Sequence, residues 1–453
     1  MNQPNILLVS LDSLRPDHLS IYGHSRTTSP NLQQLLTQDQ TTLFKNAYAT
    51  TTWTLPSHAS VFTGREPAEH GIFDKGTKID PSQTLPQILS REGYQTAAFI
   101  NNGWLTQAGI TDGFDSRFDI FEMEMPSNRI TKQLNRLKIV LSLKDNGAQT
   151  TINQFINWRD STDSWFSFLH FNEPHYLYNP PRSYQNTYLS GSAVPSILKQ
   201  RRVFTKQGDF YADNTSVSES EMNTFTDLYD GEIRYIDDQL GRLFEYLKET
   251  GGWENTLLIV FADHGELFGE RGLVGHHFCL DNALLHVPLI IKWPTASGSH
   301  PSVNESVVSL KHIFGTVLEA IGCDHPRSNA LQQYDQESER DTCVFADYRT
   351  PTSLLNQYQE QVSEFDFSEY DVSLQAVQTQ DYKLIADGDD ELLYEITGAN
   401  QEEKIPKEGN EEIYIRLQEK LDNRSQNLSL MDQEEQKDLN PNVRDNLEKM
   451  GYL

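Results

Sequence analysis

Residues 50–65 have the sequence TTTWTLPSHASVFTGR, in which many hydroxyl side chains and one imidazole lie close to a single proline. The pattern predicts a helix that begins near Thr54 and has Pro56 in its first turn. The free backbone N–H groups and the positive dipole end of such a helix suit an anionic ester. By itself the pattern is also typical of an ordinary Ser/Thr-rich helix cap. The side chains that could face a ligand are Thr54, Ser57, His58, Ser60 and Thr63.

Two further candidates follow apolar runs. NILLVSL, residues 5–11, is typical of a strand buried on both faces of a mainly parallel sheet, and Asp12 follows it. Open α/β sheets bind ligands at this end of their strands, although a lone Asp there is also a common turn residue. NTLLIVFA, residues 255–262, predicts a second such strand, followed by Asp263 and His264. An adjacent carboxylate and imidazole at a strand end match a divalent-metal pair.

Composition narrows the class of protein. A chain of 453 residues suits a large α/β core with a smaller appendage. A net charge of −28 argues against nucleic acid or an anionic membrane as the partner. No run approaches membrane-spanning length, and no basic and apolar leader precedes the first strand. The three cysteines, at 279, 323 and 343, match no zinc module and are expected to be reduced, so we expect a cytoplasmic protein.

The motifs together resemble the sulfatases, a branch of the alkaline phosphatase superfamily. The resemblance rests on NILLVSLDSLRPDHLSIYG at residues 5–23, on TLPSH…TGR at 54–65 and on DHGE at 263–266. In the family a Cys or Ser opens the motif C/S-x-P-S-R, whereas here Thr54 holds the nucleophile position and His58 the Arg position. Asp12 corresponds to a family metal ligand, and Ser13 replaces a second Asp that many members have.

The resemblance spans nearly the whole chain and implies its architecture. We expect a large, mixed, mainly parallel sheet sandwiched by helices over residues 1–325. A small antiparallel sheet, with three short strands and an acidic helical tail from Gln401, is expected over residues 326–453. Residues 178–224, rich in Pro, Ser, Tyr and Asn, predict an irregular insertion or lid over the site.

The resemblance also assigns substrate contacts. His175 ends an N-E-P-H turn that matches a family turn with a substrate-facing His. His277 stands where the family has a Lys, so it could orient an anion or protonate a leaving group. NNGWL, residues 101–105, lacks both cations of the family's G-K-W-H string and leaves an amide for a neutral hydrogen bond. The predicted catalytic imidazoles are His175 and His277, and the predicted substrate-binding residues are Ser57, His58, Asn102 and His276. His170 and His286 are predicted to be structural.

The metal and the chemistry follow from the same resemblance. Two-zinc relatives add an Asp-x-x-x-His pair after the strand near residue 170, and the string EPHYLYN lacks that pair. We therefore expect one divalent ion, Mn²⁺, Ca²⁺ or Zn²⁺, with Asp12, Thr54, Asp263 and His264 as ligands. Sulfatases oxidise their Cys or Ser to formylglycine, a route that a threonine does not have. An unmodified Thr54 resembles instead the phosphatase, phosphodiesterase and phosphoethanolamine transferase branches.

Three functions are compatible with this pattern. The first is a metal-dependent hydrolase of sulfate or phosphate esters that favours phosphate mono- and diesters. Its substrate would be a small anionic ester, with a glycan- or lipid-linked ester as one option. The second is a transferase that passes a phosphoryl or sulfuryl group to a sugar or lipid headgroup. The third is a metal-binding pseudoenzyme that lost catalysis together with formylglycine.

Overall fold

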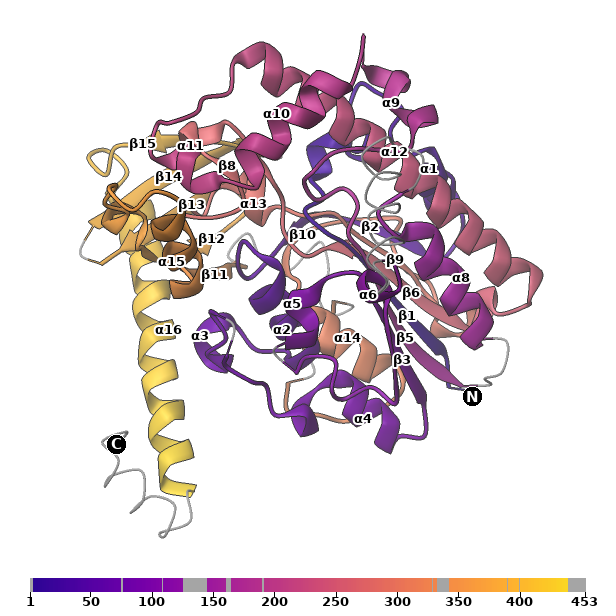
Figure 1. The fold of residues 1–453 in the computed structure, drawn as a ribbon. Coiled ribbons are helices and arrows are strands. Elements are labelled where there is room, and N and C mark those ends of the chain that lie inside the picture. Colours follow the sequence, from indigo (N-terminus) through magenta and orange to yellow (C-terminus); the bar gives the residue numbers. More distant parts are fainter. Residues whose placement is uncertain are drawn as a thin grey trace.

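The computed structural model of the protein describes residues 3–74, 76–107, 109–124, 145–159, 164–189, 191–327, 329–331, 342–388, 390–398 and 400–438. Its larger part is built on an eight-stranded sheet with the strand order β10-β2-β9-β6-β1-β5-β3-β4 (Figure 1). The strands are β1 (Asn5–Leu11), β2 (Thr41–Tyr48), β3 (Gln95–Ile100), β4 (Ser116–Asp119), β5 (Trp165–Phe171), β6 (Thr256–Ala262), β9 (Leu289–Lys292) and β10 (Val303–Ser309).

The centre of this sheet is parallel. Strand β1 pairs in parallel with β5 on one side and β6 on the other, with Leu7 opposite Ser167 and Leu258. Strand β9 runs antiparallel to β2 and β6, so the sheet is mixed. Every residue of β1, β5 and β6 is buried, which explains their nearly continuous apolar sequences. The carboxyl ends of the three strands therefore meet at one edge of the sheet.

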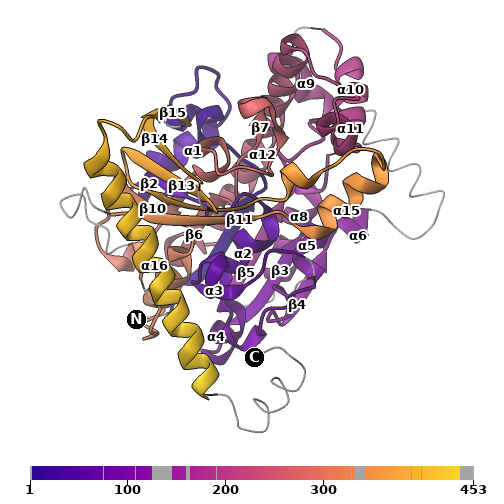
Figure 2. The same cartoon turned by 90° about the vertical axis from the view of Figure 1, so that its left-hand side faces the viewer.

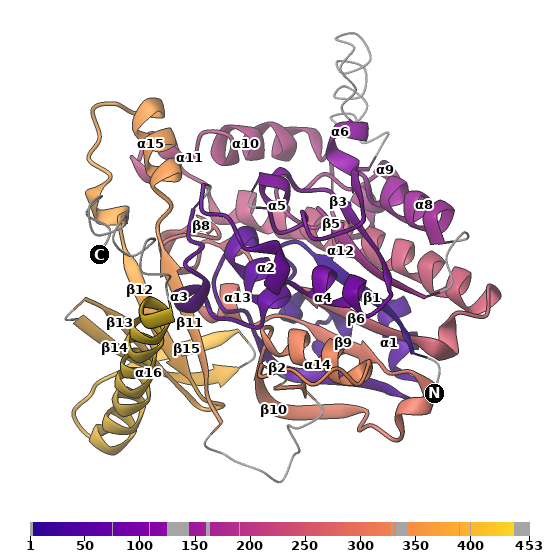
Figure 3. The same cartoon turned by 90° about the horizontal axis from the view of Figure 1, so that it is seen from below.

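Helices cover both faces of the sheet, as the sequence predicted (Figure 3). One face carries α1 (Pro30–Leu36), α8 (Ala148–Arg159) and α12 (Glu219–Glu249), and the other carries α2 (Thr54–Thr63), α4 (Leu85–Arg91) and α14 (His312–Ala320). The long helix α12 begins at a capping box, in which Ser218 and Glu221 each accept the backbone N–H of the other. The predicted sandwich of a mainly parallel sheet between helices is confirmed.

A second, antiparallel sheet follows in sequence, and α16 (Glu411–Asp438) packs across it (Figure 2). Its strands are β11 (Val344–Arg349), β12 (Ser373–Gln378), β13 (Tyr382–Asp387), β14 (Asp390–Gly398) and β15 (Gln401–Ile405). The small antiparallel sheet is thus confirmed, but the expectation of three strands missed β11 and β15. The tail from Gln401 begins as a strand rather than a helix.

The two sheets are joined at β11. The Asp347 N–H donates to Thr50 O over 2.9 Å, four residues before α2 begins at Thr54. Arg424 of α16 pairs with both Asp347 and Glu66. One hydrophobic cluster contains buried residues of both parts, among them Phe44 and Tyr348. The predicted boundary between residues 325 and 326 falls between the two sheets and stays a prediction.

Shorter elements complete the described chain. The segment predicted to be an irregular lid instead forms α9 (Arg182–Tyr188), α10 (Val194–Phe204) and α11 (Gln207–Tyr211). The other short elements are α3 (Pro67–His70), α5 (Gly103–Gln107), α6 (Ile120–Glu124), α13 (Asn282–Leu285), α15 (Thr352–Gln361) and the strand pair β7 (Leu267–Phe268) and β8 (Val274–Gly275). No described helix combines the length and apolar composition that a membrane span requires.

Candidate active site

Asp12 and the pair Asp263–His264 lie at neighbouring strand ends. Asp12 directly follows β1 and Asp263 directly follows β6, and because these strands are parallel, both side chains emerge at the same sheet edge. One ligand atom from each of the three residues lies within 4.8 Å of the other two. His264 Nε2 is 3.5 Å from Asp12 Oδ1 and 3.6 Å from Asp263 Oδ2. The structure thus brings these three predicted ligands together in one group, here called the strand-end cluster.

The strand-end cluster has the donor set of a cation site. All three side chains are fully buried, and burial together with the charge of Asp263 raises the pKa of Asp12 to about 6. Burial also raises the pKa of Asp263 to about 7, and its Oδ2 has no hydrogen-bond partner among the described residues. His264 Nδ1 lies 2.8 Å from Gly265 O and so carries the proton, which leaves the Nε2 lone pair facing the carboxylates. A divalent cation fits these donors.

Thr54 is the first residue of α2 and lies beside the strand-end cluster. Its Oγ1 is 3.3 Å from His264 Nε2. The extended backbone of Trp53 caps the helix, so the first backbone N–H groups of α2 lie next to the same group of donors. A hydroxyl at this place can serve both as a metal ligand and as a nucleophile.

A cavity of about 300 Å³ opens beside Thr54. Its lining residues are aromatic rings, amides, imidazoles and small or apolar side chains, with no lysine or arginine among the described residues that line it. Contacts to a substrate anion would therefore come from imidazole and amide side chains, from the N-terminus of α2 and from a cation bound at the strand-end cluster. Of the predicted site residues, the cavity wall contains Thr54, Asn102, His175, His276 and His277.

The three cavity imidazoles form a chain of rings. The centroid of His276 is 5.2 Å from that of His175 and 4.7 Å from that of His277. His175 Nδ1 lies 2.6 Å from Tyr176 O and so donates its proton there, which leaves Nε2 to take up or release a proton. His277 Nδ1 is 3.3 Å from the Tyr348 hydroxyl. Burial lowers the pKa of His276 and His277 well below the usual range, so both are neutral near pH 7.

Ser57 and His58 lie behind the strand-end cluster rather than in the cavity. The Ser57 hydroxyl donates to Asp263 O over 2.7 Å. His58 Nδ1 lies 2.8 Å from Thr54 O and its Nε2 2.9 Å from Ser10 Oγ, and burial lowers the pKa of the ring to about 3. Both side chains tie α2 to the strand ends, and their predicted contact with substrate has no support from the geometry.

Asn102 lies in the cavity wall as an orienting group. Its Nδ2 donates to Asp12 Oδ2 over 3.0 Å, while its Oδ1 accepts the N–H of Trp104 over 2.9 Å. The predicted neutral hydrogen bond is therefore directed, in this structure, at a carboxylate of the strand-end cluster.

Comparison with known proteins decides the family. The sulfatase family model matches residues 4–323. The chain belongs to the sulfatase family. It is 23% identical over 391 residues to the arylsulfatase of Clostridium perfringens, which covers 76% of this chain and 80% of that protein. It is 26% identical over 363 residues to the choline-sulfatase of Rhizobium meliloti, covering 70% of this chain and 69% of that one.

Solved structures give the same fold. The phosphonate monoester hydrolase of Agrobacterium radiobacter superposes with a TM-score of 0.70 at 21% identity, covering 95% of this chain and 96% of that one. The enzyme from Silicibacter pomeroyi with the same description gives 0.66 at 20% identity, covering 88% and 90%. The protein is therefore a hydrolase of the alkaline phosphatase superfamily that acts on ester bonds.

Two residues of this sulfatase-family protein lie next to the strand-end cluster, a position that the sequence did not indicate. Ser13 adopts a left-handed backbone with φ of 62°, its N–H lies 3.3 Å from Asp263 Oδ1, and its hydroxyl donates to Asp12 Oδ1 over 3.2 Å. It thus orients both carboxylates from the position of the family's second Asp. His170 Nε2 is 3.5 Å from Asp12 Oδ2. His170 lies near the end of the apolar run that forms β5, and in the sheet it is opposite Ser10, two residues before Asp12. This position near a strand end was the sequence signal that could have placed it beside Asp12.

The second sheet also reaches the site. The Tyr348 hydroxyl on β11 contacts His277, and residues of the α15 segment, including Ser353 and Gln357, line the cavity. These residues follow the family motifs by more than seventy positions and carry no motif of their own, so sequence reasoning could not assign them.

Proposed function

We propose that this sulfatase-family enzyme uses unmodified Thr54 as its nucleophile and turns over phosphate mono- and diesters better than sulfate esters. One divalent cation, Mn²⁺, Ca²⁺ or Zn²⁺, would be held by Asp12, Asp263 and His264, with Thr54 as a further ligand. The observation that carries the proposal is the position of Thr54. Its hydroxyl lies at the meeting point of the cavity, the N-terminus of α2 and the strand-end cluster.

When bound, a divalent cation at this place lowers the pKa of a coordinated hydroxyl and neutralises charge on the non-bridging oxygens. Thr54 then loses its hydroxyl proton to solvent and Oγ1 attacks phosphorus, so that a bond from Oγ1 to phosphorus forms while the bond to the leaving oxygen breaks. The leaving oxygen takes a proton from the imidazole of His175, or from His277 once that otherwise neutral ring has taken up a proton. Water later attacks the same phosphorus and the bond from phosphorus to Oγ1 breaks; the water gives a proton to the imidazole that acted as the acid, and Oγ1 regains a proton from solvent.

The preference for phosphate follows from the second half of this cycle. A phosphothreonine is resolved by attack of water on phosphorus beside the cation. A sulfothreonine requires attack at sulfur without the aldehyde hydrate that sulfatases use to expel sulfate. Sulfate esters can still react if water attacks directly and Thr54 acts only as a ligand.

The substrate is proposed to be a small anionic ester. The cavity of about 300 Å³ has room for a compact leaving group, and Trp53, Trp104 and Tyr176 offer flat apolar surface to it. The names of the relatives describe esters of aryl alcohols and of choline, and the structural neighbours are named for phosphonate monoesters. A glycan- or lipid-linked ester stays within the proposal.

The test is a panel of aryl phosphate, phosphate diester, phosphonate and sulfate esters, assayed with each metal on three variants. Thr54→Ala should lower phosphatase activity by ~10³-fold or more, because the nucleophile is removed, while Thr54→Ser keeps part of it. Thr63→Ala, at the far end of α2 with its hydroxyl bonded to Ala59 O, is the matched control and should keep wild-type activity. Intact mass should show an unmodified Thr54.

Two outcomes would overturn the proposal. One is efficient sulfate release by the wild type with phosphate esters inert. The other is full activity of Thr54→Ala. Product formation only in the presence of an added alcohol acceptor would show a transferase instead, and a lack of turnover with every metal would show a pseudoenzyme.

A further inference from the structure

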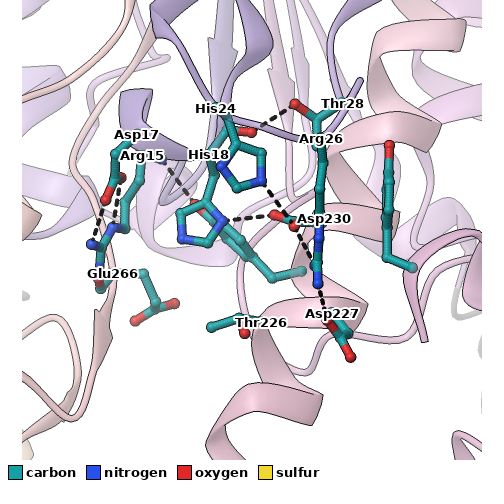
Figure 4. A network of polar contacts seen from close by, with 12 residues as sticks. Arg15, Asp17, His18, His24, Arg26, Thr28, Thr226, Asp227, Asp230 and Glu266 are labelled. Carbon is teal, nitrogen blue, oxygen red and sulfur yellow. Dashed lines mark hydrogen bonds and ion pairs between the residues drawn. The ribbon is translucent and has the colours of Figure 1, made fainter. Parts of the chain in front are cut away.

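A second imidazole–carboxylate group lies outside the active-site cavity (Figure 4). One ligand atom each from His18, His24 and Asp230 lies within 4.8 Å of the other two. His18 Nδ1 is 2.6 Å from Asp230 Oδ1, and His24 Nε2 is 3.2 Å from Asp230 Oδ2. Figure 4 shows both rings directed at the same carboxylate. We call these three residues the loop cluster; the function proposed above uses none of them.

The local chain fixes the two rings before any ligand arrives. His18 ends a short 3₁₀ turn, and Gly23, with φ of 101°, reverses the chain so that the His24 N–H donates to Leu19 O. The two ring centroids are then 5.2 Å apart. The Tyr229 ring packs edge-on against His18, with centroids 5.0 Å apart. Such preorganised donors lose little freedom when they bind an ion.

The loop cluster is open on one side and closed on the other. The side chain of Asp230 is 1% exposed, whereas those of His18 and His24 are 13% and 18% exposed. An ion can therefore enter past the imidazoles and keep a water in a remaining coordination position. Tyr229 separates the loop cluster from the strand-end cluster, because its ring contacts His18 while its hydroxyl donates to Ser13 O.

The charge balance leaves room for a cation. Arg26 is 2.7 Å from Asp230 Oδ2 and 2.6 Å from Asp227 Oδ1, so two carboxylates share one guanidinium. The two carboxylates and the guanidinium together carry one net negative charge. The Oδ1 atom of Asp230 faces His18 rather than Arg26, so it can bind an ion without breaking the Arg26 pair.

We propose that the loop cluster binds a second divalent transition-metal ion, with Zn²⁺ as the best match to its ligands. Two imidazole nitrogens, one carboxylate oxygen and an open position are a donor set that zinc accepts. Before binding, the nitrogens that face Asp230 each carry a hydrogen. On binding, those hydrogens move to the opposite ring nitrogens, which leaves the lone pairs that face Asp230 to the ion. Arg26 weakens the site by repulsion.

The experiment counts the zinc ions bound by a protein whose strand-end cluster has lost one of its ligands. Full-length Asp263→Asn protein, freed of metal, is titrated with Zn²⁺ alone by equilibrium dialysis and calorimetry. It should bind one ion per chain, and adding His24→Gln should abolish this binding. His300→Gln is the matched control, because that partly exposed imidazole stacks on Trp293 away from both clusters, and it should leave the count unchanged. Equal zinc with and without His24→Gln overturns the proposal.

A second variant separates a metal site from a simple ion-pair network. Arg26→Gln in the same background removes the competing cation and should tighten zinc binding about tenfold. If these residues serve only as an ion-pair network that holds the loop, zinc binding should not differ between the proteins with and without Arg26→Gln. Unchanged or weaker zinc binding by Arg26→Gln, in a variant whose circular dichroism shows it to be folded, therefore contradicts the proposal.

Discussion

The strand-end cluster and the loop cluster use the same side-chain types in opposite electrostatic settings. Asp12 and Asp263 face each other in full burial, no cationic side chain pairs with them in the described contacts, and Asp263 Oδ2 has no hydrogen-bond partner there. Imidazoles lie 3.5–3.6 Å from these two carboxylates, whereas Asp230 has two imidazoles at 2.6 and 3.2 Å and also pairs with the guanidinium of Arg26. Burial raises the pKa of Asp263, whereas the contacts of Asp230 outweigh its burial and lower its pKa.

The difference shows what each cluster requires. A buried pair of carboxylates with an orphaned oxygen is unfavourable unless a cation neutralises it, so the strand-end cluster is built for an ion. In the loop cluster Arg26 supplies part of the counter-charge, so these residues hold the chain together before any ion binds. The two buried carboxylates stay close together because they directly follow β1 and β6, two fully buried strands whose positions in the sheet are fixed.

The largest effect should come from Asp263→Asn. Removing a ligand of the cation forfeits several kcal/mol of transition-state stabilisation, so kcat/KM should fall by ~10³-fold. The melting temperature of the metal-free protein should not fall, because the variant removes one of two buried like charges. Steady-state kinetics and calorimetry check both parts. A variant that is both active and less stable would show that Asp263 has a structural role like that of Asp230.

The next largest effect concerns the cavity imidazoles. His175→Gln should slow esters with poor leaving groups by ~10²-fold and activated aryl esters far less, because only the former need a proton from His175 Nε2. His277→Gln tests the alternative donor in the same assay. Equal losses on both substrate types for both variants would rule out the acid role and leave binding or structure.

The sequence predicted the strand-end cluster well because its members adjoin long apolar runs. NILLVSL and TLLIVFA are typical of buried strands of a parallel sheet, and the carboxyl ends of neighbouring parallel strands lie at one edge of the sheet. Thr54 and the cavity imidazoles came from the family pattern instead. The predicted contacts of Ser57 and His58 with substrate stay predictions; α2 directs these side chains at Asp263 O and Ser10, a packing that the sequence pattern alone did not indicate.

The loop cluster shows the other limit of sequence reasoning. His18 and Asp230 are more than two hundred residues apart, and nothing in the local pattern of either predicts their contact. The lid segment was misjudged for a related reason, since its Pro- and Ser-rich composition hid the short helices α9, α10 and α11. The strand β11 likewise follows a polar stretch, so its contribution of Tyr348 to the cavity depended on tertiary packing.

The third prediction sharpens the contrast in stability. Asp230→Asn should destabilise the fold at pH 7 by ~2 kcal/mol, less than a fully buried pair would, because Arg26 is 37% exposed. A lowered folded-state pKa contributes stability above the unfolded value of about 4, and this stability is lost as pH falls. The gap between wild type and variant should therefore stay near its full size down to about pH 4 and shrink below it, as measured by urea unfolding at pH 7 and at about pH 3. The same gap at both values would contradict the assignment.

The smallest effect should come from Tyr229→Phe, at the residue that separates the two clusters. Its hydroxyl donates to Ser13 O over 2.7 Å and accepts the Arg15 N–H over 2.9 Å, and Ser13 in turn contacts both carboxylates of the strand-end cluster. Losing these bonds costs about 1 kcal/mol in holding Ser13, which corresponds to a roughly fivefold weaker binding of the catalytic cation.

The ring that packs on His18 is kept in Tyr229→Phe, so zinc binding at the loop cluster should not change. Titration with Mn²⁺ measures binding of the catalytic cation at the strand-end cluster. The zinc count in the Asp263→Asn background measures binding at the loop cluster. Ser13→Ala, which removes only the bond to Asp12, should give a loss of similar size at the strand-end cluster. A Tyr229→Phe variant that weakens both sites equally would mean that the two clusters are not independent and that the tyrosine couples them.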